Sequence, residues 1–541
     1  MKIYNKILSV VAVLSAFMLF SCGDFIENPP RGQQTLDNYF QTETECQTFV
    51  NGLYKRMIEH EDWWQILASR LANEMATDDA WMGNTEQNPD EYRWAAHYYI
   101  TPTNLGMLSD MFRTRFENIS ACNYAIAGIE NAPISDAKKA RLTAEAKFCR
   151  SYEYLELVNN FGGIALVTSP IGTADMNKER ATKEEVYAQI FADLKEAVDV
   201  LPVMSPSQAQ GVASKGAAMA LLARAYLFSG DWQNAYNYAN QVIESGTYRL
   251  EADFLNIWSV YNPNGVESIF EVQMGITDKG LGNQICTVAG ARGEHRDYFP
   301  SGDSKDVMDG WGWGVPTSDL ENCYLSENDD IRRKSTISRF MEPVYGDEEL
   351  NPTYYFSKAA NKSMRAIRKY YIPVGMRRTL DDKRKQAPLN MPVLRLAEMY
   401  LTRAEAAWRL NNPGQATADM NVIRSRVSLP DKTGLSGNDL LYAIWKERRM
   451  ELAFEGIRLY DIRRQIDPAT NKPVIASLFG SNGSFVRYNT QTSTDEYETA
   501  NLVEAQNKGT MFDESKHLLW PIPQGEIDRS MGQIKQNPGY N

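Results

Sequence analysis

Two stretches of the chain predict pairs of antiparallel helices, and these pairs restrict the fold more than any other feature. Residues 214–248 read SKGAAMALLARAYLFSGDWQNAYNYANQVIESGTY, where small alanines would let two helices approach across a tight Gly-Asp-Trp turn. Residues 393–427 repeat the pattern around the turn Asn412-Pro413-Gly414. Helical hairpins of this kind usually stack into a curved scaffold. The chain is therefore predicted to be mainly α-helical, with tetratricopeptide-like hairpins.

Other segments extend this helical prediction and interrupt it once. Residues 107–131 and 135–160 have helical periodicity and are candidates for a further pair, with Gly162-Gly163 closing the second helix. In contrast, residues 247–393 are rich in Gly, Pro, Asn, Asp and aromatic residues, with one short alternating strand at 267–275. Long irregular segments inside folded proteins are usually functional or disordered, and the aromatic content favours ordered loops. We therefore expect large irregular loop regions and a few short strands on the helical scaffold.

The N-terminus indicates an exported, lipid-anchored protein. Lys2 and Lys6 precede the apolar run Ile7–Phe20, which fits a signal sequence and is short for a bilayer span of about 20 residues. Leu19-Phe20-Ser21-Cys22 resembles a bacterial lipobox, although Phe20 is bulky for its place. Cys22 would then be the acylated first residue of the mature protein, and two or three acyl chains anchor stably. The alternative is a plain signal peptide that happens to contain a cysteine.

The expected organisation has five parts, which follow from these composition changes. They are a lipoprotein signal peptide (1–21), a polar tether (22–36), an N-terminal helical region (37–246), a loop-rich ligand-side region (247–393) and a C-terminal helical region (394–541).

Composition argues against several classes of function. The 541 residues carry a formal net charge of −12, whereas a nucleic-acid-binding protein needs a basic footprint. The 4 His are not spaced as metal ligands and the 6 Cys include no CxxC pair, so no zinc site is predicted. The Asp-rich loops have no EF-hand pattern, and there is no nucleophile elbow, P-loop or dinucleotide fingerprint. No cofactor is predicted.

Two aromatic and polar clusters are the candidate ligand site. Sugar rings present an apolar face and a hydroxyl rim, so a site for them combines flat aromatic rings with polar side chains; Tyr and Trp also suit recognition surfaces. The first cluster lies in residues 75–99 and the second in residues 296–320. The predicted ligand-binding residues are Trp81, Trp94, Tyr98, Asp78, Asn84, Tyr298, Trp311 and Trp313. The alternative is that these aromatic residues anchor loops onto the scaffold.

Three glutamates raise the question of catalysis. Glu447, Glu451 and Glu455 would lie on one face of a helix, where two of them could form a glycosidase pair. Stacked like charges repel unless cations pair with them, and Arg448, Arg449, Arg458, Arg463 and Arg464 are close in the sequence. A buried Arg–Glu network that fixes helix packing is the better account, and no catalytic residue is predicted.

Three stretches resemble the SusD/RagB family of outer-membrane nutrient-binding lipoproteins of Bacteroidetes. They are AEAKFCRSYEYLELVNNFGGIALV (144–167), IWKERRMELAFEGIRLYDIRRQ (444–465) and LLWPIPQGEIDRSMGQIKQNPGY (518–540). Ala165 stands where many members have proline, and Arg529-Ser530-Met531 departs from the usual Asn-Pro. The lipobox, the hairpins and the acidic balance fit as well.

The resemblance implies a binding role rather than an enzymatic one. Such proteins lie on the outer face of the outer membrane, held by a lipid anchor, over a TonB-dependent SusC-like transporter. They capture an oligosaccharide or polysaccharide, and in some members a peptide, at a site built by exposed loops, while the helical scaffold packs against the transporter. A surface glycosidase or lyase and a purely structural lipoprotein remain alternatives. A fold-level match does not name the glycan.

Overall fold

The computed structural model describes most of the chain. It covers residues 39–57, 67–83, 95–170, 178–275, 282–299, 301–308, 310–347, 363–382, 387–488 and 508–540. The predicted signal peptide, Cys22 and the tether lie outside the described residues, and so do Asn84 and Trp94.

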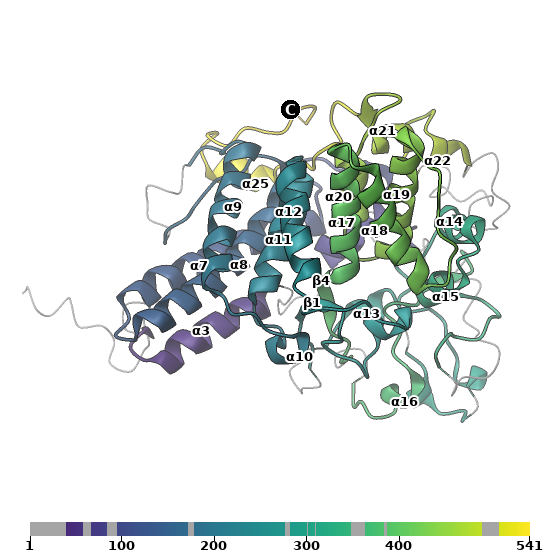
Figure 1. Cartoon of the computed structure of the whole chain (residues 1–541), viewed down its shortest axis with the longest axis horizontal. Coiled ribbons are helices and arrows are strands. Elements are labelled where there is room, and N and C mark those ends of the chain that lie inside the picture. The colour runs from purple at the N-terminus through teal and green to yellow at the C-terminus, as the bar shows by residue number, and fades with distance from the viewer. Residues whose placement is uncertain are drawn as a thin grey trace, which may run out of the picture.

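Long helices packed side by side form the body of the molecule (Figure 1). The first group is α3 (Glu43–Arg56), α7 (Met107–Asn131), α8 (Asp136–Phe161), α9 (Lys183–Val200), α11 (Lys215–Ser229) and α12 (Trp232–Glu244). The second group is α17 (Leu396–Arg409), α18 (Pro413–Arg426), α19 (Gly437–Leu452) and α20 (Arg458–Arg464). Helices α7, α8, α9, α11, α12, α17 and α18 each contact the next in that order. The mainly α-helical prediction is therefore confirmed, because helical hairpins stack along the chain.

Both predicted hairpins are present, and local capping explains their turns. Helix α11 ends at Gly230 with φ +86°, and the side chain of Asp231 accepts the Asn234 N–H to start α12. Asn412 caps α18 in the same way, and Pro413 occupies the first helical position. The pair predicted from 107–131 and 135–160 is α7 and α8, and Gly162 ends α8 with φ +73°. Short-range signals were sufficient for these boundaries.

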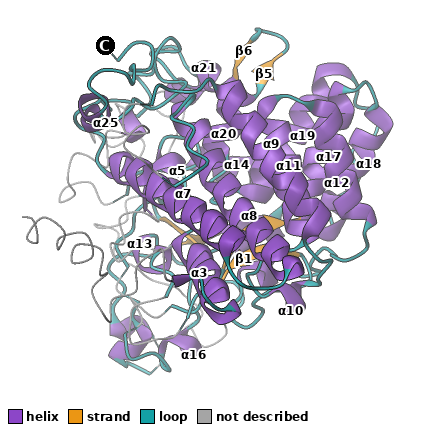
Figure 2. Cartoon of the chain, turned by 90° about the vertical axis from the view of Figure 1, so that its left-hand side faces the viewer, coloured by secondary structure: helices purple, strands orange, loops and turns teal. Residues whose placement is uncertain are grey.

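Three small antiparallel sheets accompany the helices. Strand β1 (Ser268–Val272), predicted from the sequence, pairs with β4 (Met391–Arg395). Strand β2 (Ile337–Arg339) pairs with β3 (Arg365–Ile367). Strand β5 (Ile466–Asp467) pairs with β6 (Lys472–Pro473), and Figure 2 shows this hairpin at the edge of the molecule. Every residue of β1 and β4 is buried, which ties the loop-rich region to the scaffold.

Short helical elements fill the loops between these parts. They are η1 (Leu67–Ala72), α5 (Asn73–Met75), α10 (Pro206–Ala209), η3 (Phe254–Trp258), α13 (Ile285–Val288), η4 (Arg296–Tyr298), η5 (Ser304–Asp306), α14 (Ser318–Glu327), α15 (Asp330–Thr336), α16 (Val374–Arg377), α21 (Val474–Leu478), α22 (Ser484–Arg487) and α25 (Gln524–Arg529). Figure 1 shows α13 and α16 beyond the ends of the long helices, on the side of β1 and β4.

Two apolar cores support this arrangement. The larger one lies between the long helices and includes Phe148 and Leu221, and a second lies under the loop-rich region around Trp258 and Tyr324. Within the ranges that the structure describes, no helix is both long enough and apolar enough to cross a bilayer.

Candidate functional site

The two predicted aromatic clusters come together, although they are far apart in the sequence. Ala80 and Gly83 form antiparallel bridges with Pro316 and Trp313, respectively. The Trp81 N–H also donates to the carbonyl of Val315 at 2.7 Å. Backbone pairing therefore makes one structural unit of the segments 80–83 and 311–316.

A third segment, around α13, joins this unit through glycines. The Trp311 and Trp313 N–H groups donate to the carbonyls of Thr287 and Val288, at 2.9 and 3.0 Å. A Cβ at Gly310 would lie 2.3 Å from the carbonyl group of Gly290, and one at Gly83 would lie 1.8 Å from the carbonyl oxygen of Gly312. Only glycine allows main chains to approach this closely. The predicted site residues did not include these glycines, although the GWGWG pattern indicates two of them, Gly310 and Gly312.

Trp81 and Tyr98 lie in the core rather than on the surface. Trp81 has no exposed area; its ring packs against Phe485, and the Lys508 ammonium lies 5.7 Å from its centre. Tyr98 is buried, stacks on Trp520 and donates its hydroxyl to the carbonyl of Ala76 at 2.5 Å. In this structure both rings have the loop-anchoring role that was the alternative to ligand contact.

The second cluster has one buried and one half-buried indole. Trp313 is 4 % exposed, and its ring meets that of Trp311 edge to face at 5.2 Å. Trp311 is half-buried and packs against the main core. Tyr298 ends the short helix η4, but its side chain lies outside the description, as do Asn84 and Trp94. Among the predicted site aromatics with described side chains, Trp311 thus keeps the largest exposure.

Asp78 is a buried ion-pair partner. Its carboxylate lies 2.8 Å from Arg458 and 3.0 Å from Arg449, and it has no exposed area. Burial alone would raise the pKa of Asp78, but Arg449 and Arg458 outweigh that effect and hold the pKa well below its usual range. Asp78 therefore fixes its own segment against α19 and α20 instead of presenting a carboxylate to solvent.

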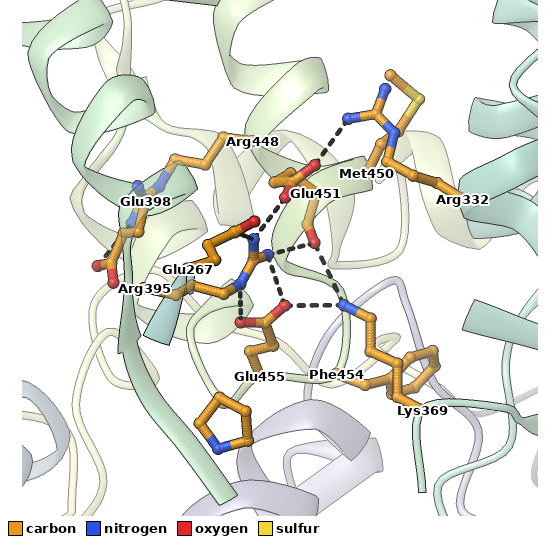
Figure 3. Close-up of polar contacts among 12 residues, drawn as sticks. Glu267, Arg332, Lys369, Arg395, Glu398, Arg448, Met450, Glu451, Phe454 and Glu455 are labelled. Atoms are coloured by element: carbon orange, nitrogen blue, oxygen red, sulfur yellow. Dashed lines mark hydrogen bonds and ion pairs between the residues drawn. The ribbon is translucent and has the colours of Figure 1, made fainter. Parts of the chain in front are cut away.

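Glu447 and Glu451 of α19 belong to the predicted buried ionic network, and so does Glu455; Figure 3 shows the part around Glu451 and Glu455. The helix ends at Leu452, so Glu455 lies beyond it and does not share the predicted helix face. Glu451 pairs with Arg395 at 2.5 Å, with Arg332 at 3.1 Å and with Arg426. Glu455 pairs with Arg395 and Lys369, both at 2.8 Å. Glu447 pairs with Arg332 at 2.6 Å and with Arg424 at 3.0 Å. The prediction of a structural Arg–Glu network is confirmed.

The prediction of which cations pair with these glutamates was wrong. The five arginines close in sequence do not pair with these glutamates; the partners come from α15, α18, β4 and the segment after β3. Arg448 pairs instead with Asp461, and Arg464 with Glu405 and Asp461. Arg449 lies two residues from both Glu447 and Glu451, a spacing at which helical side chains do not face each other. Arg448 is three residues from Glu451, but its guanidinium is engaged by Asp461.

The pKa shifts of the glutamates in this network fit a structural role, in which their charges hold segments of the chain together. Burial would raise the pKa values of Glu451 and Glu455, but the surrounding guanidinium and ammonium groups lower both. A glycosidase acid needs a raised pKa and access to substrate, and both glutamates are buried. Arg449 of the same helix forms a separate set of ion pairs, with Asp79 at 2.6 Å and with Asp319 at 2.7 Å. The segments on either side of the 80–83 and 311–316 pairing are therefore held by the same helix.

The other two recognised stretches contact each other. Asn537 donates to the carbonyls of Phe161 and Trp520, at 2.9 and 2.7 Å, and Arg180 donates to Asn537 at 2.7 Å. The carbonyl of Gly163 accepts from Arg180 at 2.6 Å. The C-terminal stretch thus closes the end of α8, where the Phe-Gly-Gly turn leaves carbonyls that need donors.

A protein metal site needs several ligand side chains that converge on one point. Within the ranges given above, no group of three or more His, Cys, Asp or Glu side chains is arranged to hold a metal ion.

Family models match the chain in two blocks. Residues 24–227 match a model described as "starch-binding associating with outer membrane", and residues 267–540 match the SusD family model. A SusD-like protein P2 of Formosa agariphila is 28 % identical, with 100 % of both chains covered. The starch-binding protein SusD of Bacteroides thetaiotaomicron is 24 % identical, covering 63 % of this chain and 67 % of SusD.

Solved structures agree with this match. A laminarin-binding SusD-like protein has a TM-score of 0.71 and 25 % identity, covering 93 % of this chain and 100 % of that one. A surface glycan-binding protein A of B. thetaiotaomicron, in complex with laminarihexaose, has a TM-score of 0.71 and 20 % identity, with coverage of 91 % and 99 %. The family models span most of the chain in two blocks, and the fold agrees over nine-tenths of it. The chain belongs to the SusD family of glycan-binding proteins.

Proposed function

We propose that this protein is a lipid-anchored receptor on the outer face of the outer membrane, which captures an oligosaccharide and delivers it to a SusC-like TonB-dependent transporter. Family membership supports the glycan-binding class, and the lipobox at Cys22 supports the anchor. The description of the N-terminal family model supports the outer membrane as the location.

The observation that carries the binding role is the backbone pairing of 80–83 with 311–316. This pairing places a half-buried indole, Trp311, on a surface made by two loops that glycine contacts and the ion pairs of Arg449 hold rigidly. Loops on a rigid scaffold are where binding residues concentrate, because the scaffold meets the entropic cost of ordering them. We propose Trp311 as the ring on which a sugar stacks. Tyr298, Asn84 and Trp94, in the two aromatic clusters at 75–99 and 296–320, are further candidates.

Three alternatives predict different behaviour. A peptide-binding receptor would bind peptides and no glycan. A surface glycosidase or lyase would release product from the polysaccharide that it binds. A structural lipoprotein would bind no ligand and would still co-purify with its transporter.

Affinity electrophoresis of the mature protein tests the proposal. Native gels containing laminarin, starch or other polysaccharides should retard the protein relative to bovine serum albumin, with no new reducing ends in the gel. Laminarin is the first choice because a relative of the same fold is a laminarin-binding protein. Retardation together with new reducing ends would favour the enzyme, and no retardation by any polysaccharide would contradict the receptor.

A further inference from the structure

A surface loop in the second aromatic cluster begins and ends at one point. This loop, residues 295–307, leaves at Glu294 and returns at Met308, and the structure describes residues 295–299 and 301–307 of it. The Glu294 carboxylate accepts the Met308 N–H at 2.7 Å, so the two ends are joined. Compact surface loops whose ends meet in this way are frequently functional.

Two consecutive arginines hold the ends of this loop. Arg377 ends α16, and Arg378 follows it. Arg377 is 1 % exposed and donates from Nη1 to the Glu294 carboxylate at 2.9 Å and to the Asp306 carbonyl at 2.6 Å. Arg378 donates from two nitrogens to the two carboxylate oxygens of Asp306, at 2.7 and 2.9 Å. Paired hydrogen bonds of this kind fix geometry as well as adding strength. We call these contacts of Arg377 and Arg378 the arginine clasp.

Apolar packing fixes this loop incompletely. Phe299 is buried in a small apolar core with Tyr371 and Val374. A cavity with about 300 Å³ of empty space borders the clasp, and its lining includes Met308 and Arg377. Atoms that border empty space lack packing partners on that side. The ion pairs of the clasp are therefore needed to fix where the loop lies.

We propose that Arg377 and Arg378 are positioning residues for glycan binding, because they hold the 295–307 loop in the conformation that completes the binding surface. This inference rests on the glycan-binding function proposed above. At most about 15 Å of chain separates the end of the loop from Trp311, and the loop itself carries Tyr298. A loop that is already ordered costs less entropy on binding than one that the ligand must order. The clasp should therefore raise the affinity for glycan without contacting it.

Affinity electrophoresis of the full mature protein in laminarin and starch gels tests the clasp at Arg378. Its side chain is 38 % exposed, so it can be replaced with less risk to folding than Arg377. Arg378→Met removes the charge and should weaken glycan binding about tenfold. Arg378→Lys keeps the charge without the two parallel hydrogen bonds, and its affinity should lie between that of Arg378→Met and that of the wild type.

A double-mutant cycle identifies the ion pair as the cause. Asp306→Asn should weaken glycan binding as much as Arg378→Met does. The double variant should bind no more weakly than either single variant, because both residues act through one contact.

The matched control breaks an ion pair of the same geometry in the hairpin scaffold. Arg403 on α17 donates from Nε and Nη2 to the two carboxylate oxygens of Asp419, at 2.8 and 2.6 Å. Arg403→Met should lower the free energy of unfolding and leave glycan binding unchanged. Thermal denaturation of every variant sets a temperature at which all of them are folded, and binding is compared there.

Hydrogen–deuterium exchange follows the loop itself, without any glycan. The N–H groups of Asp306, Val307 and Met308 are all hydrogen-bonded in the structure. Arg378→Met should speed their exchange with solvent, because local opening exposes them. Arg403→Met should leave their exchange unchanged.

Each result supports or overturns the proposal. Wild-type affinity in Arg378→Met, or equal losses of affinity in Arg378→Met and Arg403→Met, overturns it. Unchanged exchange in Arg378→Met also overturns it, since the loop would then be ordered without the clasp. A wild type that binds no polysaccharide contradicts the function proposed above and with it the binding role of the clasp, and the exchange result then still shows whether the arginines order the loop.

Discussion

Trp313 lies opposite Gly83 in an antiparallel bridge. Gly312, the residue before Trp313, is so close that a Cβ on Gly83 would lie 1.8 Å from the Gly312 carbonyl oxygen. Gly83 also has φ +91°, a conformation that other residues rarely adopt. This contact joins the first aromatic cluster to the second, so the loop surface proposed to bind glycan depends on it.

Replacing Gly83 by alanine should therefore be costly. Both the steric overlap and the backbone strain act in the folded state, and the expected loss of unfolding free energy is about 2–4 kcal/mol. Urea denaturation measures it. Gly52→Ala is the control: Gly52 lies inside α3 with open space around it, so the same change there should stabilise by up to about 1 kcal/mol. Equal effects of the two variants would contradict the close contact.

Removing the charge of Glu451 should destabilise the protein strongly. Arg332, Arg395 and Arg426 would stay buried with less compensating charge, and breaking a buried ion pair from one side costs about 3–5 kcal/mol. Glu451→Gln is the variant, and denaturant midpoints are the measurement. Glu43→Gln breaks the exposed pair with Lys138 and should cost less than about 1 kcal/mol. A loss at Glu451 as small as at Glu43 would refute the network as a stabilising element.

Glu74 should make stability fall with rising pH. Burial, reinforced by the nearby Asp79, raises the pKa of Glu74 to about 8, against 4.5 for an unperturbed glutamate. Between these two values the folded state holds a proton that the unfolded state has lost. The free energy of unfolding should then decrease by about 1.4 kcal/mol per pH unit from this group, and no further above pH 8.

The Glu74→Gln variant isolates this effect. It stays neutral in both states, so the difference in unfolding free energy between variant and wild type should grow from pH 5 to pH 8. Glu196→Gln makes the same substitution at an exposed position and is the control. A constant difference for Glu74→Gln across this range would show that Glu74 is ionised in the folded protein.

Trp311→Ala should weaken glycan binding with the fold intact. The loss of one stacking ring should reduce affinity about tenfold, measured as reduced retardation in affinity gels. Tyr124→Ala removes a half-buried aromatic from α7 and serves as the control for nonspecific effects. If Trp311→Ala binds like the wild type, the stacking residue has to be sought among Tyr298, Trp94 and Asn84.

Cys22→Ala should release the protein from the membrane. Without the thiol no acyl chain can be attached to sulfur, and the remaining signal should export an unanchored protein. Metabolic labelling with a fatty acid and membrane fractionation measure this. An acylated, membrane-bound Cys22→Ala variant would refute the lipobox.

The chain's local signals were sufficient to predict its helices and its family. Alanine-rich hairpins, caps such as Asp231 and Asn412, and the glycine that ends α8 act within one or two turns, so the sequence shows them directly. The sequence also predicted that cations would pair with Glu447, Glu451 and Glu455, because closely spaced carboxylates repel one another unless cations compensate them. It did not predict that α19 ends at Leu452, which leaves Glu455 beyond the helix.

Only the tertiary structure decided which residues meet. Trp81 and Trp313 are buried, whereas Trp311, two residues from Trp313, stays half-exposed, and nothing in their local sequence separates them. The arginines that pair with Glu451 come from three separate segments, and those adjacent to it point elsewhere. Helix periodicity fixes the direction of a side chain on its own helix. Which segment lies opposite depends on packing across the whole chain, and that packing also places Arg377 and Arg378 at the ends of the 295–307 loop.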